Sequence, residues 1–501
     1  MMLRYSDKYF TADIDLKNLG SKTARRGAVA ISGQAIVFAV QFSGIIILAR
    51  MLSPSDFGLV GMVTVLMLLI RFFREFGLTK ATMQRAVISR PEISNLFWIN
   101  AGISLMLGVL LMACAPLIAS FYGREELTQI AMVLAGGLII EGLGLQHRAL
   151  MMRGMEFGKL ALCDVVAQCL SVLVGLISAF YGLGYWALVL MPIALSVTRL
   201  SLILWFTRWI PSMVSNHGDT RSYLSFGSNL FGYNLLNYFS RSTDSILIGR
   251  FLGAETVGLY SYAYRLLMFP MQQLNSPMLN VMLPTFSRLQ DEPDRFAVTY
   301  YKTLSMMIAV TFPFIGLAYA IAPSVFTFVL GVEWIGSAYL FQILAPAAFV
   351  TSLNVATDWV YLARGETNRM FKWALFRVPF TLICMVIGLF YGGVGGVAFS
   401  VSFSMCVLLV PYIKSTFKNT NLSLNRVFSI IGRAFLPVFI SMLLTAQANM
   451  ILVLDLFLFR LIALSSVYSL CYICFDSIFN RSNSSLHQAW FFVKKLKKPV
   501  L

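Results

Sequence analysis

Long apolar stretches separated by short polar segments run along the whole chain. A helix needs about 20 mostly apolar residues to cross a bilayer, and fourteen stretches meet this requirement. No connection between them is long enough to hold a separate globular domain. The pattern predicts an all-α polytopic membrane protein with spans at residues 27–49, 57–77, 95–120, 128–146, 160–181, 185–207, 223–249, 256–284, 303–322, 337–361, 373–391, 396–413, 427–446 and 450–475.

The composition excludes a soluble or disordered chain. Of 501 residues, 58% are hydrophobic and only 12% are charged, whereas soluble domains carry about 25% charged residues. The net charge of +17 would suggest nucleic acid in a soluble protein. In a membrane protein, however, lysine and arginine gather in cytosolic loops, so we expect no nucleic-acid partner. The cysteines fall in apolar stretches and the histidines are scattered, so we expect no metal site.

The basic residues also orient the predicted spans. Alternate loops and the two tails hold 28 lysines and arginines, and the opposite loops hold only Arg50, Arg124 and Arg250. The positive-inside rule therefore places both termini in the cytosol, as an even number of spans requires. The first 26 residues lack the apolar core and cleavage site of a signal peptide, so we expect them to remain as a cytosolic tail.

The sequence repeats itself weakly at an offset that starts at 200. Residues 48–52 and 57–59 match residues 248–252 and 257–259, so that Gly58 corresponds to Gly258. Phe180-Tyr181-Gly182 later corresponds to Phe390-Tyr391-Gly392. Six spans separate equivalent points, which predicts two parallel six-helix bundles and two extra C-terminal helices. The expected parts are a tail (1–26), a bundle (27–207), a linker (208–222), a second bundle (223–418), two helices (419–475) and a basic tail (476–501).

Ionisable residues inside spans are costly and are candidates for function. Arginines near span ends are expected to snorkel to the headgroups, namely Arg71, Arg74, Arg377, Arg433 and Arg460. Glu141 and Asp164 lie toward the cytosolic half of their spans, where they would either relay protons or pair with arginines.

The seventh span carries a polar stripe. Asn234, Asn237, Arg241 and Asp244 follow each other at steps of three and four, so they share one helix face. Lipid cannot solvate such a stripe, which must face a cavity or other helices. We favour a cavity, with an Arg241–Asp244 pair that only joins helices as the alternative. Gln34 and Gln41 occupy the equivalent positions of the first span.

The eighth span adds a second cation in the middle of the membrane. Arg265 is followed by Gln272 one heptad later on the same face. The span also contains Pro270, Pro277 and Pro284, and prolines permit a transmembrane helix to bend. We expect this helix to be a hinge.

Several tracts resemble one family. They are Phe226–Asp244, Ile248–Glu255, Tyr260–Leu266, Pro284–Asp291 and Arg148–Phe157. Together they resemble the bacterial polysaccharide transporters of the multidrug/oligosaccharidyl-lipid/polysaccharide exporter superfamily, most nearly the colanic-acid and lipopolysaccharide exporters. The resemblance runs from about residue 22 to the end of the twelfth span and is most specific in spans seven and eight.

This resemblance implies a flippase in the bacterial inner membrane. Such proteins move an undecaprenyl-pyrophosphate-linked oligosaccharide to the periplasmic leaflet by alternating access through a cationic cavity. The matching positions are Arg241 and Arg265, with Asn234, Asn237 and Asp244 beside them. Arginine suits this ligand because its planar fork binds phosphate oxygens. Expected partners are the lipid-linked glycan, membrane lipids, a polymerase and glycosyltransferases; no cofactor is expected, and H⁺ or Na⁺ are candidates for a coupling ion.

Three other classes compete with a flippase. A cation-coupled drug exporter of the same superfamily would need carboxylates for organic cations, and arginines in the membrane repel these. A glycosyltransferase or polymerase would need catalytic groups at the periplasmic surface, but residues 181–185 and 391–396 contain no ionisable acid or base apart from tyrosine. A structural scaffold would not need the polar stripe in span seven.

Overall fold

The computed structural model describes residues 19–74, 82, 89–213, 238, 242–418, 420–451 and 457–479. All regular structure in these ranges is helical. Eleven of the helices are long and apolar enough to cross a membrane. The prediction of an all-α polytopic membrane protein is therefore confirmed.

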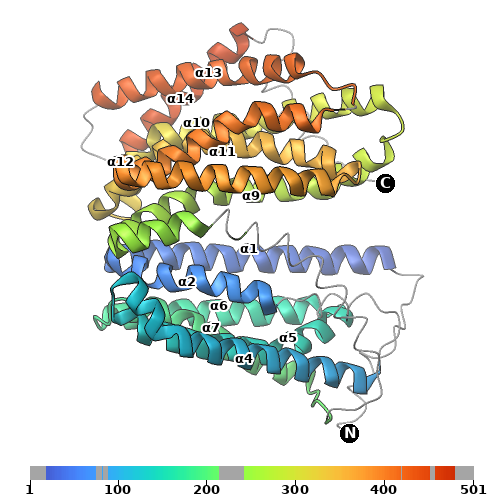
Figure 1. The fold of residues 1–501 in the computed structure, drawn as a ribbon, viewed down its shortest axis with the longest axis vertical. Helices are drawn as coiled ribbons and strands as arrows, with labels where there is room; N and C mark the ends of the chain where they lie inside the picture. The colour runs from blue at the N-terminus through green and yellow to red at the C-terminus, as the bar shows by residue number, and fades with distance from the viewer. Residues whose placement is uncertain are drawn as a thin grey trace. The chain divides into compact units, whose positions relative to one another are not determined.

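The chain forms two compact units, and the division falls between Gly258 and Leu259. Unit 1 contains α1 (Leu19–Met51), α2 (Pro54–Arg74), α4 (Arg90–Tyr122), α5 (Glu126–Arg153), α6 (Phe157–Phe180) and α7 (Trp186–Thr207). Within this unit, α6 packs against α1 and α7, and α5 packs against α4 and α7 (Figure 1). Residues 242–252 add a further helical segment.

Local sequence signals set the ends of α4. The Ser89 hydroxyl accepts a hydrogen bond from the backbone N–H of Glu92, and the Glu92 carboxylate accepts one from the backbone N–H of Ser89. This capping box starts the helix at Arg90. The helix therefore begins five residues before the predicted span, which covered only the apolar part of the helix. At the other end Gly123 adopts a left-handed conformation with φ 69°, which glycine accepts without strain.

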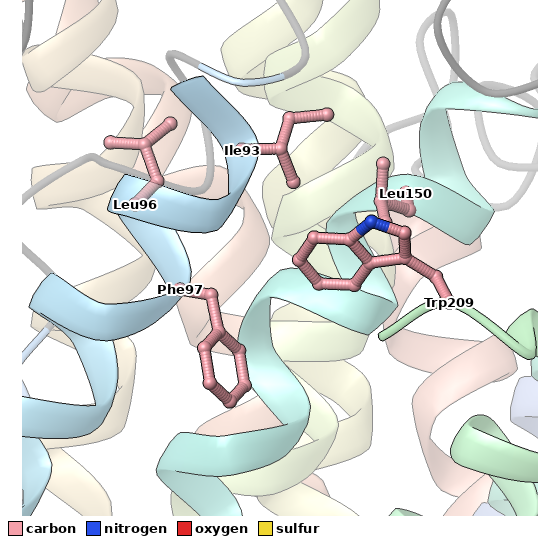
Figure 2. Close-up of a cluster of buried hydrophobic side chains, with 5 residues drawn as sticks. All are labelled: Ile93, Leu96, Phe97, Leu150 and Trp209. Carbon is pink, nitrogen blue, oxygen red and sulfur yellow. The ribbon is translucent and has the colours of Figure 1, made fainter. Parts of the chain in front are cut away.

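A buried apolar cluster holds the segment after α7 in unit 1 (Figure 2). Its members are Ile93, Leu96, Phe97, Leu150 and Trp209. The Trp209 ring points toward α4 and α5, and the Trp209 carbonyl oxygen lies 3.3 Å from Nε2 of His147. Aromatic burial and a backbone contact together fix this segment where the helix has ended.

Unit 2 contains most of α9 (Ala254–Arg288) and all of α10 (Pro293–Val329), α11 (Ile335–Ala363), α12 (Thr367–Thr416), α13 (Leu424–Ile451) and α14 (Phe457–Phe479). A short 3-10 turn, η3 (Val332–Trp334), precedes α11. Helix α11 packs against α10 and α12, while α13 and α14 pack against each other and against α10. The Tyr468 hydroxyl of α14 donates a hydrogen bond to the Pro313 carbonyl of α10 over 2.9 Å.

Helix α12 is two helical arms joined by a tight turn. Gly392 and Gly393 have non-helical backbone angles, and Gly393 has a positive φ of 54°. The arms correspond to the predicted spans 373–391 and 396–413. A Cβ atom on Gly388 would lie 2.3 Å from the Gly396 carbonyl oxygen, so glycine permits the arms to approach backbone to backbone.

Helix α9 runs without interruption through Pro270, Pro277 and Pro284. Three prolines in one span therefore do not break the helix in this structure, and its role as a hinge remains a prediction. Helix α14 begins at Phe457, later than the predicted start at 450, and residues 452–456 lie outside the described ranges.

The charge bias predicts which membrane side each loop faces. A phosphatase reporter inserted at Arg124, between α4 and α5, should be active because this loop is expected in the periplasm. The same reporter inserted at Gly154, between α5 and α6, should be inactive. Activity at both sites, or only at Gly154, would contradict the predicted orientation.

Candidate functional site

The predicted cavity residues are only partly covered by the structure. Asn234, Asn237 and Arg241 lie outside the described residues. Gln272 lies within the continuous helix α9. Gln34 and Gln41 are both exposed on α1, and their spacing of seven residues puts them on one helix face. This face of α1 therefore presents two amides that the helix neighbours do not cover.

Asp244 belongs to the helical segment at residues 242–252 and is 4% exposed. One of its carboxylate oxygens accepts a hydrogen bond from the backbone N–H of Ser245 over 2.7 Å. A buried carboxylate needs such donors because the hydrocarbon region offers no water. Asp244 is thus held by unit 1, while the Arg241 partner considered from the sequence lies outside the described residues.

Arg265 has a different environment. It lies in the part of α9 that belongs to unit 2, and its side chain is exposed. Its guanidinium carbon lies 5.9 Å from the centre of the Tyr262 ring, and that tyrosine packs in turn against Trp334 with ring centres 4.5 Å apart. Among the described residues, no carboxylate forms an ion pair with Arg265. The structure therefore leaves its guanidinium accessible, with a buried aromatic base beneath it.

A cluster of paired charges lies inside unit 1. Glu141 of α5 contacts Arg74 of α2 over 3.0 Å and Arg71 over 3.5 Å. Asp164 of α6 forms a bidentate pair with Arg148 of α5, with N–O distances of 2.8 and 2.9 Å. The two pairs tie α2 to α5 and α5 to α6.

Arg199 of α7 completes this cluster. Its Nε atom lies 2.9 Å from an Asp164 oxygen, but the N–H bond has no hydrogen-bond acceptor, so the contact is an ion pair only. We name the group of Arg71, Arg74, Glu141, Arg148, Asp164 and Arg199 the arginine–carboxylate cluster. Its four cations and two carboxylates leave an excess of two positive charges.

The expected snorkelling of Arg74 is wrong. Its side chain is 2% exposed and bonds to Glu141, whereas the Arg71 side chain is 45% exposed. Depth along the helix could not separate these two arginines, since they lie one turn apart. The partner of Arg74 is 67 residues away in the chain, and no local pattern marks a pair at that distance.

Unit 1 also contains a chain of buried polar contacts that the sequence pattern did not predict. The Asn100 amide donates to the Gln146 carbonyl oxygen over 3.3 Å, and the Gln146 amide donates to the Thr82 hydroxyl over 3.1 Å. Arg153 donates to the Thr82 backbone carbonyl over 3.2 Å. These contacts satisfy polar groups that burial would otherwise penalise. The sequence does not predict these contacts, because each of the residues by itself is an ordinary polar residue near the end of a span.

The arginine–carboxylate cluster joins helices and does not have the geometry of a catalytic site. Each carboxylate contacts two guanidinium groups, and the thiol of the neighbouring Cys163 is fully buried. Within the same ranges, no group of three or more His, Cys, Asp or Glu residues could hold a metal ion. The arrangement can stabilise the packing of α2, α5, α6 and α7, and its excess charge favours anions nearby.

Removing one charge from the cluster should destabilise unit 1. Glu141→Gln leaves Arg74 buried without an anion, which should lower the free energy of unfolding by roughly 3 kcal/mol. The double variant Arg74→Met/Glu141→Leu should recover most of this loss, since apolar groups need no partner. Thermal unfolding of the purified protein in detergent measures both effects.

The exposed pair Arg295–Glu292 offers a matched control. Its N–O distance is 2.7 Å, but the side chains are 73% and 48% exposed, so Glu292→Gln should leave the unfolding midpoint unchanged. Equal effects of Glu141→Gln and Glu292→Gln would contradict a stabilising role for the buried pair.

Comparison with known proteins identifies the family of the chain and its similar proteins. The family model described as "Polysaccharide biosynthesis protein" matches residues 47–339. The chain is 25% identical over 419 residues to the lipopolysaccharide biosynthesis protein WzxC of Escherichia coli, covering 81% of this chain and 83% of that protein. It is 24% identical over 374 residues to the succinoglycan biosynthesis transport protein ExoT of Rhizobium meliloti, covering 74% of each.

Two solved structures share the fold. The lipid II flippase MurJ in an inward closed conformation aligns with a TM-score of 0.69 at 15% identity, over 90% of this chain and 99% of that one. An inward-facing multidrug resistance MATE transporter aligns with a TM-score of 0.60 at 15% identity, over 80% and 98%. At this identity the likeness shows the common architecture of the helices.

Proposed function

The chain belongs to the family of polysaccharide biosynthesis proteins, and we propose that it is a flippase for lipid-linked oligosaccharides. The proposed role is that of a multi-pass membrane transporter of the multidrug/oligosaccharidyl-lipid/polysaccharide exporter superfamily, in line with the succinoglycan biosynthesis transport protein and the lipid II flippase that it resembles. The proposed cargo is an undecaprenyl-pyrophosphate-linked glycan, which moves from the cytosolic to the periplasmic leaflet of the bacterial inner membrane.

The accessible guanidinium of Arg265 carries this proposal. Arg265 lies about 16 Å along α9 from Ala254, since a helix rises 1.5 Å per residue. At such a depth an arginine faces protein, water or a bound anion. No carboxylate among the described residues pairs with it, and its side chain is exposed. A pyrophosphate group supplies the missing negative charge and accepts paired hydrogen bonds from a guanidinium.

The other cavity residues extend the same site. Arg241, Asn234 and Asn237 would bind the remaining phosphate oxygens and the first sugars. The amides of Gln34, Gln41 and Gln272 would hydrogen-bond to sugar hydroxyls, and Asp244 would orient Arg241 or carry a coupling proton. Alternating access between the two units would then expose this site to each leaflet in turn.

The remaining partners follow from this cargo. Glycosyltransferases would build the oligosaccharide on the cytosolic side, and a polymerase would receive it in the periplasm. Transport would be driven by the cargo gradient or by H⁺ or Na⁺. The excess positive charge of the arginine–carboxylate cluster supports an anionic cargo rather than an organic cation.

Replacing Arg265 tests the proposed site. Arg265→Ala should lower polymer export by about 10- to 100-fold, the effect of losing a hydrogen-bonded charge. Arg265→Lys should retain part of the export, because the charge remains while the planar fork is lost. Surface polymer is measured relative to the abundance of the protein in the membrane.

Arg288→Ala is the matched control, because Arg288 is an exposed arginine at the end of the same helix. It should export at the level of the unmodified protein. Normal export by Arg265→Ala combined with Arg241→Ala, at unchanged abundance, would overturn the cationic site. Transfer of a fluorescent lipid-linked oligosaccharide in proteoliposomes would test the cargo directly.

A further inference from the structure

The chain that leaves α7 exposes large apolar side chains at the end of the helix. Helix α7 ends at Thr207, and residues 208–213 continue without regular secondary structure. The side chain of Ile210 is 85% exposed and that of Met213 is 89% exposed. The Trp205 ring, in the last turn of the helix, is also exposed. Neighbouring apolar side chains of this size on a surface mark an interaction site.

Hydrogen bonds and buried packing fix this segment on unit 1. The Trp98 indole N–H of α4 donates to the Ser212 carbonyl oxygen over 2.9 Å, and the Ser212 backbone N–H donates to the Ser94 hydroxyl over 3.0 Å. The Trp209 ring lies in the buried cluster with side chains of α4 and α5 (Figure 2). The exposure of the two apolar side chains beside Trp209 is therefore set by the packing of unit 1 and is not the property of a loose loop.

Two cations lie against aromatic rings at the same end of α7. The guanidinium carbon of Arg208 lies 5.9 Å from the centre of the Trp205 ring, and the ammonium of Lys159 lies 5.8 Å from the centre of the Phe206 ring. Lys159 also contacts the Glu156 carboxylate over 3.2 Å. Arg208 is exposed, and no carboxylate among the residues that the structure describes forms an ion pair with it. The N–H groups of Arg208 are thus accessible to an anion outside unit 1.

The backbone of Arg208 supports a role for its side chain. Its φ angle is 47°, in the left-handed region, and its N–H donates to the Leu204 carbonyl oxygen over 3.0 Å to end the helix. Glycine commonly ends helices in this conformation because it has no Cβ atom to strain. An arginine at this position instead places a long cationic side chain where the helix stops, which indicates that the side chain has a use of its own.

The length of α7 places this segment at the surface of the bilayer. Its 22 residues form a helix about 33 Å long, close to the hydrocarbon thickness of about 30 Å. A chain that leaves such a helix at residue 208 therefore lies at the depth of the lipid headgroups. Tryptophan and arginine are typical of that layer, and the charge bias predicts that this end of α7 faces the cytosol.

We propose that residues 205–213 form an anchor in the cytosolic leaflet, in which Arg208 binds the phosphate of an anionic phospholipid while Ile210 and Met213 enter the boundary of the acyl chains. Apolar side chains beside a cation match the two layers of a membrane surface, and anionic lipids attract basic residues at this surface. A soluble protein would have to reach these side chains through the headgroups, so the bilayer itself is the better occupant. The anchor goes beyond the proposed transport function and does not depend on the cargo.

A spin label at residue 210 measures the depth of the segment. The full-length protein, with its native cysteines replaced and Ile210→Cys labelled, is reconstituted in nanodiscs that contain phosphatidylglycerol. Oxygen collects among the acyl chains and a nickel chelate stays in water, so the ratio of their effects on relaxation of the label reports its depth. The label at residue 210 should be more accessible to oxygen, as a label in Leu204→Cys should be.

Asp291→Cys is the matched control, because Asp291 is exposed in the turn after α9 and is expected in water. Its label should be more accessible to the chelate. The same preference for the chelate at residue 210 is the result expected if the surface receives a soluble protein, and it would overturn the anchor.

A photoreactive phosphatidylglycerol tests the headgroup contact. With a diazirine close to its headgroup, this lipid should label residues 205–213 in nanodiscs, as identified by peptide mapping. Arg208→Gln should lower this labelling by about 10- to 100-fold, the effect of losing a hydrogen-bonded charge. Labelling by the matching phosphatidylcholine should be weaker and should not change in Arg208→Gln.

Arg250→Gln is the control for a general loss of charge. Arg250 is also exposed and also lies against an aromatic ring, 5.7 Å from the centre of Phe121, but the charge bias places it on the periplasmic side. Labelling of residues 205–213 in this variant should equal that in the unmodified protein. Equal labelling by the two lipids, or labelling that Arg208→Gln leaves unchanged, would overturn the phosphate contact.

Discussion

The hydrocarbon region of a bilayer contains no water, so every backbone amide and every charge in it needs a partner or an aqueous cavity. This constraint explains why all regular structure in the described ranges is helical. It also explains the buried arginine–carboxylate cluster, in which Arg74 is almost fully enclosed and bonds to Glu141. Where a helix must end, a capping box at Ser89 or a left-handed glycine at Gly123 supplies the missing partners.

The same constraint also applies to charges in the membrane that have no partner within the protein. In the arginine–carboxylate cluster, arginines from neighbouring helices neutralise the carboxylates. These paired charges therefore stabilise the packing of the helices. Arg265 has only the face of Tyr262 beside it among the described residues. Under the proposed function, an anionic cargo would supply the counter-charge of Arg265 for part of the transport cycle.

The internal repeat has a mechanical consequence. Two parallel copies of a motif that meet at a local two-fold axis bring equivalent residues together, and only glycine allows the backbones to touch there. Close approach of this kind lets transmembrane helices pack tightly through their backbones.

The sequence by itself determined the helical membrane class, the repeat and the resemblance to polysaccharide transporters, because hydropathy and local motifs depend only on residues that are close together in the chain. It also separated the two arms of α12 around Gly392. The tertiary structure decided which charges compensate each other. Pairs such as Arg74–Glu141 and Arg199–Asp164 join different helices far apart in the chain, and the contact between Gly58 and Ala254 joins residues nearly 200 positions apart. Such contacts depend on how the helices pack in three dimensions, and no local pattern in a single sequence predicts them.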